Sequence, residues 1–178
     1  MSRTALGTEG AWFEPEEMGE LRRRLPIPYV DVVPVRTDVD GTVSQVGLLL
    51  RASGAGRIIR DIVSGRVLIH ETLREAIARH IDKDLGPMAL PRIPASPVPF
   101  TVAEYFPTPG QSLFTDARQH AIALGYIVPV DGECAPQEDA LELAWFDVAE
   151  LMDSPVLDEM ENGHDIIVRR ALAHAGVI

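Results

Sequence analysis

The chain has a single cysteine, no long hydrophobic run and a deficit of positive charge. Cys134 alone excludes an intrachain disulfide framework and a cysteine-based zinc site, and we expect a bland, partly buried thiol rather than a nucleophile. No segment approaches the ~20 apolar residues needed to cross a bilayer, and residues 1–10 lack the apolar stretch of a secretory signal. The sequence therefore predicts a cytoplasmic protein without a membrane partner.

The charge balance narrows the class of ligand. The 27 acidic and 16 basic side chains give a net charge of −11, which repels a nucleic-acid polymer. A small phosphorylated molecule remains compatible with such a chain only where local cations or a divalent metal intervene. With 178 residues, 46% of them hydrophobic, and no internal repeat, the chain is expected to form one core.

Local patterns predict alternating helices and strands. Expected helices cover 14–25 and 73–85, a further helix begins at 147–152, and a helical region runs from 154 to about 176, in which Asn162-Gly163 is a candidate interruption. Expected strands cover 29–36, 44–51, 57–63, 100–106, 120–130 and 141–146. Pro34 suggests that the first strand ends there or lies at a sheet edge, and the next two strands are expected to pair as a hairpin. Residues 87–99, rich in proline, and 107–118 read as long ordered loops. These patterns alone indicate only an α+β protein.

The stretch from Gly65 to Gly86 holds the most informative spacing. Glu71 follows the first glycine after five residues, and Arg79 follows Glu71 after seven. Thr72 begins a capping box with Glu75, which predicts that a helix starts at residue 73, and Gly86 suits the left-handed position that ends it. This G-x5-E-x7-R frame and its closing glycine resemble the Nudix box.

The resemblance to the Nudix superfamily extends over about residues 29–175. The strand at 120–126 is similar to the family's hydrophobic strand after the box, and residues 142–151 resemble its late strand-to-helix segment. The resemblance implies an α/β (α+β) fold, an α/β/α sandwich around a mixed, curved sheet. It makes 29–178 a single Nudix-like domain, on which residues 1–28 pack as a helical extension, and it implies a homodimer.

The second half of the box differs from the family's pattern. Where the family carries glutamates that hold magnesium against a pyrophosphate, this chain has His80, Lys83 and Asp84. The resemblance implies that Glu71 and Asp84 are catalytic metal ligands, oriented by the catalytic Arg79, and that Mg²⁺ or Mn²⁺ is the cofactor. His80 is a candidate ligand for a softer metal. The Lys83 ammonium would repel a cation bound beside it.

Several further side chains are candidates for the site. Glu104 could supply a supplementary metal-binding carboxylate, and Arg57, Arg60, Arg66 and Lys83 could meet phosphate oxygens, although the arginines could equally be solvated or paired with acids. Glu75 and Asp82 read as a charged helix face. We expect His120, Tyr105, Phe106 and Phe114 to pack in the core rather than to act on a ligand.

Two functions follow from the resemblance. The first is a divergent, metal-dependent Nudix-type hydrolase that cleaves a phosphoanhydride in a nucleoside diphosphate linked to another moiety. The second is a catalytically impaired Nudix-fold protein that binds a phosphorylated ligand or a protein partner. Lys83 distinguishes them, because a fixed positive charge can take the place of the metal beside a phosphate. In both, the loops 87–99 and 107–118 are expected to shape the ligand site.

Overall fold

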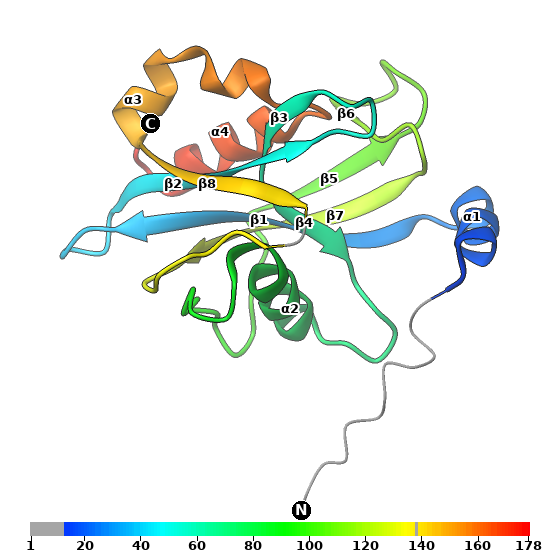
Figure 1. Ribbon diagram of the computed structural model, residues 1–178, viewed down its shortest axis with the longest axis horizontal. Coiled ribbons are helices and arrows are strands. Elements are labelled where there is room, and N and C mark those ends of the chain that lie inside the picture. Colours follow the sequence, from blue (N-terminus) through cyan, green and yellow to red (C-terminus); the bar gives the residue numbers. More distant parts are fainter. Residues whose placement is uncertain (1–12, 138) are drawn as a thin grey trace, which may run out of the picture.

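A computed structural model describes residues 13–137 and 139–178, which form one mixed β-sheet with helices on both faces (Figure 1). The elements in chain order are α1 (Pro15–Arg24), β1 (Ile27–Thr37), β2 (Val43–Ala52), β3 (Ile58–Asp61), β4 (Val63–Arg66), α2 (Leu73–Leu85), β5 (Thr101–Phe106), β6 (Phe114–Thr115), β7 (Ala121–Pro129), β8 (Ala140–Asp147), α3 (Val148–Asp153), η2 (Pro155–Glu159) and α4 (His164–His174). The absence of a signal sequence, expected from residues 1–10, concerns a segment outside the described residues. No helix of the described chain is long and apolar enough to span a membrane.

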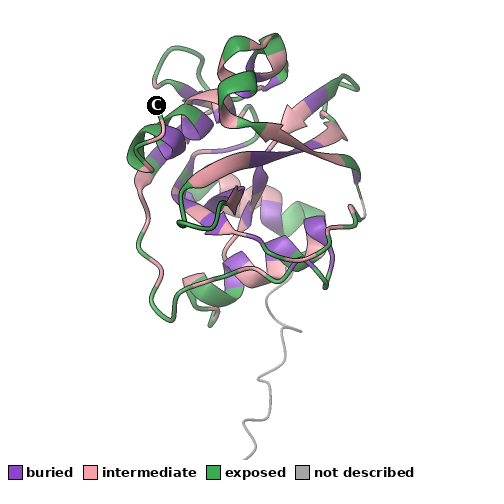
Figure 2. Cartoon of the chain, turned by 90° about the vertical axis from the view of Figure 1, so that its left-hand side faces the viewer, coloured by how far each residue is buried: buried purple, intermediate pink, exposed green. Residues whose placement is uncertain are grey.

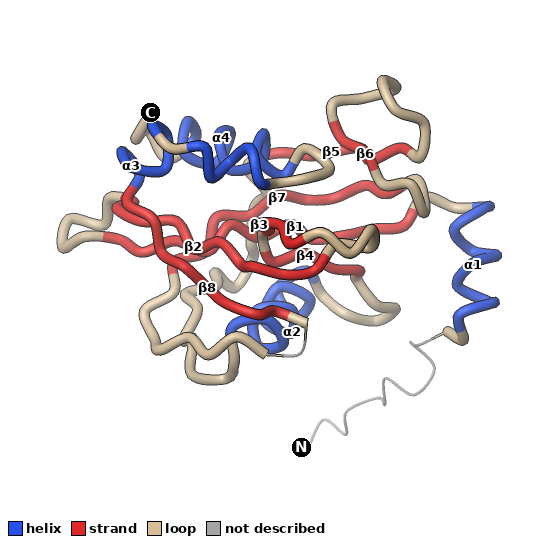
Figure 3. The backbone as a smooth tube through the Cα atoms, turned by 45° about the horizontal axis from the view of Figure 1, so that its top comes forward, coloured by secondary structure: helices blue, strands red, loops and turns tan. Residues whose placement is uncertain are grey.

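The sheet is organised around β1. The main strand order is β3-β2-β1-β7-β5-β6, with β8 added beside β2 and β4 beside β1. β1 runs parallel to β7 and pairs antiparallel with two strands in turn: β4 along residues 29–32 and β2 along residues 35–37. The sheet therefore divides where β4 and β2 meet, and it curves around this division (Figure 3). The predicted mixed, curved sheet is confirmed.

Two apolar layers flank the sheet. Val30 and Val32 of β1 pack under α2, while Val33 and Val35 pack on the opposite side with α3, η2 and α4, as expected for side chains that alternate along a strand. The buried faces of the helices turn toward the sheet (Figure 2). This arrangement is the predicted α/β/α sandwich.

Helix α2 forms for local reasons. The Thr72 hydroxyl accepts a hydrogen bond from the Glu75 N–H, and the Glu75 carboxylate accepts one from the Thr72 N–H, so the helix starts with a complete capping box. Its inner face buries Ala76, Ile77, Ile81 and Leu85 against the sheet. Gly86 ends the helix with a φ of 86°, a conformation that favours glycine.

The structure corrects the predicted strands at three places. Pro34 does not lie at an edge: it stands in the central strand, between the segments that pair with β4 and with β2. The strand expected at 57–63 is two strands, because the Asp61 carboxylate accepts a hydrogen bond from the Ile62 N–H and the chain leaves the ladder there. Residues 114–115, expected in a loop, form β6 beside β5.

The aromatic side chains beside the long loops pack against other rings of the chain, as expected. The Tyr105 and Phe114 rings are buried with centroids 5.3 Å apart, and Phe106 stacks on His120 at 4.4 Å. Cys134 is half-buried, and burial raises the pKa of its thiol, although Arg36 lowers it in part. Such a thiol is a weak nucleophile at neutral pH.

Helix α1 touches the rest of the chain through few side chains. Met18 is buried, and the Arg22 Nε donates a 2.9 Å hydrogen bond to the Gln119 Oε1. β1 begins at Ile27, two residues before the expected strand. The division of the chain into an extension, 1–28, and a domain, 29–178, stays a prediction.

Candidate functional site

A cleft of about 770 Å³ opens where the sheet divides. Its walls come from β1 to β4, from α2, from residues 116–118 and from the start of α4, so it joins both faces of the sheet. Its charged lining residues are Arg51, Asp61, Arg66, Arg79, Lys83, Asp116, Arg118, Glu161 and His164. Five of these are arginine or lysine and three are carboxylates, although the whole chain is acidic. The cleft is therefore suited to an anion.

The retained half of the box forms a closed ion pair. The Arg79 Nε donates to Glu71 Oε1 at 2.6 Å, its Nη2 donates to Glu71 Oε2 at 2.8 Å, and the same Nη2 donates to the Arg66 carbonyl at 2.9 Å. The Leu68 N–H also donates to Glu71 Oε2. Burial would raise the pKa of Glu71, but these hydrogen bonds outweigh it and lower the pKa. The pair ties the loop before α2 to the helix.

His80 occupies a place shaped by Gly65. A Cβ at Gly65 would lie 1.8 Å from the His80 Cε1, so only glycine leaves room for this ring. The His80 Nε2 donates to the Arg66 carbonyl at 3.0 Å, and burial lowers the pKa of the ring, which is neutral at pH 7. Among the described residues its Nδ1 is buried without a hydrogen-bond partner.

Asp84 lies among cations. It is fully buried, its Oδ2 lies 3.1 Å from the Arg51 Nη2, and its Oδ1 lies 3.4 Å from the Lys83 Nζ. Arg51, at the end of β2, also contacts Asp61 at 3.3 Å and Asp139 at 3.5 Å. Burial would lower the pKa of Arg51, but the three carboxylates outweigh it and raise the pKa. We refer to Arg51, Asp61, Lys83, Asp84 and Asp139 as the Arg51 cluster.

A buried histidine faces the same cleft from α4. The His164 Nδ1 bonds to the Asp61 Oδ1, and the residue is only 8% exposed. Burial would lower the pKa of His164, but the Asp61 carboxylate outweighs it and raises the pKa to about 9. Burial would likewise raise the pKa of Asp61, but His164 and Arg51 lower it. At neutral pH the two side chains form an imidazolium–carboxylate pair.

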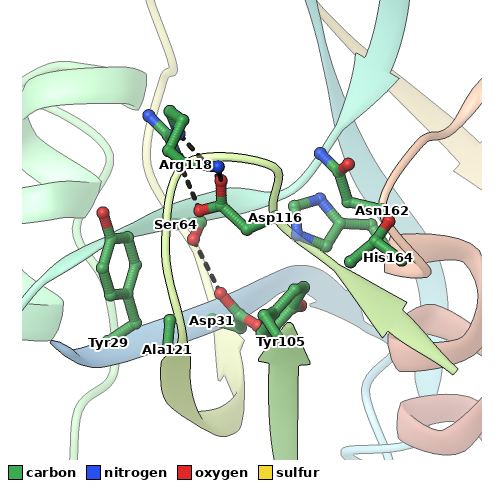
Figure 4. Close-up of a pocket in the computed structure, with 10 residues that line it drawn as sticks. Tyr29, Asp31, Ser64, Tyr105, Asp116, Arg118, Ala121, Asn162 and His164 are labelled. Atoms are coloured by element: carbon green, nitrogen blue, oxygen red, sulfur yellow. Dashed lines mark hydrogen bonds and ion pairs between the residues drawn. The ribbon is translucent and has the colours of Figure 1, made fainter. Parts of the chain in front are cut away.

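A smaller polar cavity continues from the cleft (Figure 4). The buried Asp31 accepts 2.7 Å hydrogen bonds from the Ser64 hydroxyl and from the Tyr105 hydroxyl. Opposite, the Arg118 guanidinium forms two 2.9 Å hydrogen bonds with the Asp116 carboxylate. Burial and Asp31 raise the pKa of Tyr105, so its hydroxyl stays a donor.

The structure brings some predicted site residues together and separates others. Arg66, Arg79, His80 and Lys83 line the cleft, and Glu71 and Asp84 lie directly behind them. Three candidates are not carried into the site: Arg57 is exposed and pairs with Glu161, Arg60 pairs with Glu142 and lies over the Phe146 ring, and Glu104 is exposed beside Ile122.

Sequence reasoning missed Arg51, Asp61 and His164. Each stands at or near the end of an element, at a position that is ordinary by itself: Arg51 near the end of β2, Asp61 at the end of β3 and His164 at the start of α4. One local signal could have indicated two of them. Arg51 follows the apolar run 48–50 and His164 follows Asn162-Gly163, so both are polar residues at the end of a buried element. Their convergence depends on contacts across more than 30 residues of sequence, since Arg51 and Asp84 are 33 apart.

The residues at positions 80, 83 and 84 do not fit a divalent cation. Asp84 is their only carboxylate, and each of its oxygens already faces a positive side chain. At 4 Å and an effective dielectric of 20, a divalent ion is repelled by about 8 kcal/mol for each such cation. Within residues 13–137 and 139–178, no group of three or more His, Cys, Asp or Glu side chains is placed to hold a metal ion.

Known proteins share this fold. A crystal structure of a possible asymmetric diadenosine tetraphosphate hydrolase from Jonesia denitrificans is 58% identical, with a TM-score of 0.83 over 86% of this chain and 96% of that one. The Nudix domain of NrtR from Shewanella oneidensis, solved with ADP ribose, is 15% identical with a TM-score of 0.61, over 90% and 92% of the chains. A bifunctional NMN adenylyltransferase/ADP-ribose pyrophosphatase from Francisella tularensis, solved with AMP and a manganese ion, is 15% identical with a TM-score of 0.60, over 90% and 47%.

The box frame, the divided sheet and these likenesses show that the chain has the Nudix fold. Residues 8–177 match a family described as a domain of unknown function (DUF4916), and the chain belongs to this family. No curated protein matches the sequence.

Proposed function

We propose that the cleft binds a small molecule with a diphosphate or longer phosphate chain, and that the protein hydrolyses a phosphoanhydride in a nucleoside diphosphate linked to another group. The observation that carries this proposal is the concentration of charge: five of the chain's 16 basic residues line the cleft, against three of its 27 acidic residues. Fixed guanidinium and ammonium groups in a partly buried cleft are strong phosphate ligands.

The cleft chemistry suits phosphoryl transfer to water. In this reaction a water oxygen bonds to phosphorus, the bridging P–O bond breaks, and two phosphate products leave with the protons of the water. Negative charge grows on the phosphate oxygens, where Arg51, Arg66 and Lys83 can stabilise it. His164, charged at neutral pH, can donate a hydrogen bond to the leaving oxygen.

The similar proteins support the ligand class. The Jonesia protein is named for a dinucleoside polyphosphate, and the two more distant structures contain ADP ribose or AMP. We therefore propose diadenosine polyphosphates and ADP ribose as the first compounds to test.

The experiment measures product formation from a panel of dinucleoside polyphosphates, nucleotide sugars, ADP ribose and nucleoside triphosphates by chromatography and ³¹P NMR. Each compound is tested with Mg²⁺, with Mn²⁺ and with EDTA. We expect turnover of at least one compound and at least a tenfold loss in Lys83→Met. Arg92→Met removes an exposed ion pair with Asp131 outside the cleft and is the matched control. No product in any condition contradicts the hydrolase proposal.

A second candidate is a Nudix-fold protein that binds such a ligand, or a protein partner, without turnover. It is favoured by the state of Asp84, the sole carboxylate among positions 80, 83 and 84, which two cations already neutralise. Binding of ADP by calorimetry without product, together with hydrolysis that appears in Lys83→Glu, would establish this alternative.

A homodimer and a cytoplasmic location, expected from the resemblance and the composition, stay predictions. Size-exclusion chromatography with light scattering tests the first, and fractionation of cells tests the second.

A further inference from the structure

In the Arg51 cluster a guanidinium lies at the centre of three carboxylates. Arg51 offers one nitrogen to each of three carboxylates: Nε to Asp61, Nη2 to Asp84 and Nη1 to Asp139. These aspartates come from the end of β3, from α2 and from the segment before β8. Neighbouring carboxylates repel one another unless a positive charge lies between them, and here that charge is the Arg51 guanidinium, which is part of the chain itself.

Lys83 completes the second side of the cluster. Its Nζ lies 3.4 Å from Asp84 Oδ1 and 3.7 Å from Asp139 Oδ1, the oxygens that do not face Arg51. Both oxygens of each of these aspartates therefore point toward a positive nitrogen. Arg51 has 12% of its side chain exposed and Lys83 has 33%, and both line the cleft. Asp84 and Asp139 do not line the cleft, whereas the two cations that contact them do, together with Asp61.

We propose that Arg51 and Lys83 are a built-in replacement for the divalent metal of the Nudix box, so that the phosphate chain of the ligand binds to them directly and needs no metal. This inference rests on the proposed ligand class, a small phosphorylated molecule. The guanidinium offers more N–H groups than its three carboxylate contacts require, and the lysine ammonium has three donors on a flexible stem. Asp61, Asp84 and Asp139 hold the two cations in place, and His164 adds positive charge behind Asp61.

The composition of the chain offers a direct test, because Lys83 is its only lysine. Reductive methylation followed by mass spectrometry reports the accessibility of this one ammonium, and the amino terminus is an internal control for reagent activity. The probes are inorganic pyrophosphate, ADP and ADP ribose, each with EDTA or with Mn²⁺. We expect the probes to slow methylation of Lys83 about as strongly in EDTA as in Mn²⁺.

The outcomes separate this inference from the proposed function. Protection that requires Mn²⁺ overturns the replacement of the metal but leaves the phosphorylated ligand in place. A lack of protection by every probe in both conditions overturns both. Loss of the free Mn²⁺ signal in electron paramagnetic resonance, on addition of the wild-type protein without probe, would also overturn the inference, since no metal should bind.

Two variants examine Arg51 itself. Arg51→Met removes the charge and is expected to weaken metal-free pyrophosphate binding roughly tenfold or more, which corresponds to the loss of a charge-assisted hydrogen bond. Arg51→Lys keeps the positive charge and serves as the test variant if Arg51→Met does not fold. It should bind pyrophosphate more tightly than Arg51→Met but less tightly than wild type. Unchanged affinity in a folded Arg51→Lys and in Lys83→Met, measured beside Arg92→Met, would refute the role of these cations.

Discussion

Gly65→Ala tests how the rewritten box is held together. The new Cβ would lie 1.8 Å from His80 Cε1 and 2.3 Å from Nε2, so the ring must move by more than 1 Å. Overpacking of this kind costs about 1–3 kcal/mol, and displacement of the ring also breaks its hydrogen bond to the Arg66 carbonyl, worth about 1 kcal/mol. We expect the free energy of unfolding, measured by urea titration with circular dichroism, to fall by about 3 kcal/mol.

The matched control is Gly54→Ala, where a new Cβ meets no atom of residues 13–137 and 139–178 within 4 Å. It should change the free energy of unfolding by less than about 0.5 kcal/mol. His80→Ala removes the clashing ring, so the double variant with Gly65→Ala should be more stable than the sum of the two single changes predicts. Strict additivity, or a Gly65→Ala protein as stable as wild type, would refute the packing argument.

Three further predictions concern buried polar groups. The raised pKa of His164, about 9 against its ordinary 6.5, means that its pairing with Asp61 stabilises the fold fully below pH 6.5 and is lost as the pH rises through 9. Urea titrations should therefore show a loss of up to about 3 kcal/mol between pH 6 and 10 that is absent in His164→Gln; equal pH profiles would contradict this. Asp84→Asn should lower the free energy of unfolding, measured by urea titration, by about 3 kcal/mol, because it leaves two cations of a buried cluster with one carboxylate fewer. A change below about 0.5 kcal/mol would show that this charge is unimportant. Tyr105→Phe deletes a 2.7 Å hydrogen bond to a buried carboxylate and should cost about 1–3 kcal/mol. Tyr126→Phe removes a buried hydroxyl that has no hydrogen-bond partner among the described residues, and it should be neutral or stabilising; the reverse order in urea titration would contradict the assignment.

The parts of the fold that could be predicted are those whose causes are local. Helix α2 begins and ends where the sequence indicates, because the capping box at Thr72 and the glycine at 86 act within a few residues. The break at Ile62 was missed because it depends on a side-chain hydrogen bond from one residue to its neighbour, which a hydrophobic pattern does not reveal. Pro34 was misjudged because a proline in a central strand is tolerated only where the pairing partner changes, and partner changes are not local.

The candidate site likewise has residues that the sequence indicates and residues that it does not. Glu71, Arg79, Lys83 and Asp84 could be selected because they stand at known spacings in one helix and the loop before it. The distant residues that contact them in the folded chain could not be predicted from the sequence. Arg51 lies 33 residues before Asp84, and His164 lies 103 residues after Asp61, so their proximity appears only when the divided sheet brings β2, β3, α2 and α4 to one cleft.

The altered positions of the box are not independent losses, because each has a structural partner elsewhere in the chain. His80 fits the space above Gly65, and Lys83 and Asp84 join Arg51. A box that had merely lost its metal would leave Asp84 as a buried, uncompensated carboxylate, at a cost of several kcal/mol. Arg51 on β2 supplies the compensation, and it does so at the position where positive charge can still face the ligand. Arg51 therefore both stabilises the fold and keeps positive charge in the cleft for a phosphate. The intact Glu71–Arg79 ion pair holds the loop before α2, which forms part of the cleft wall.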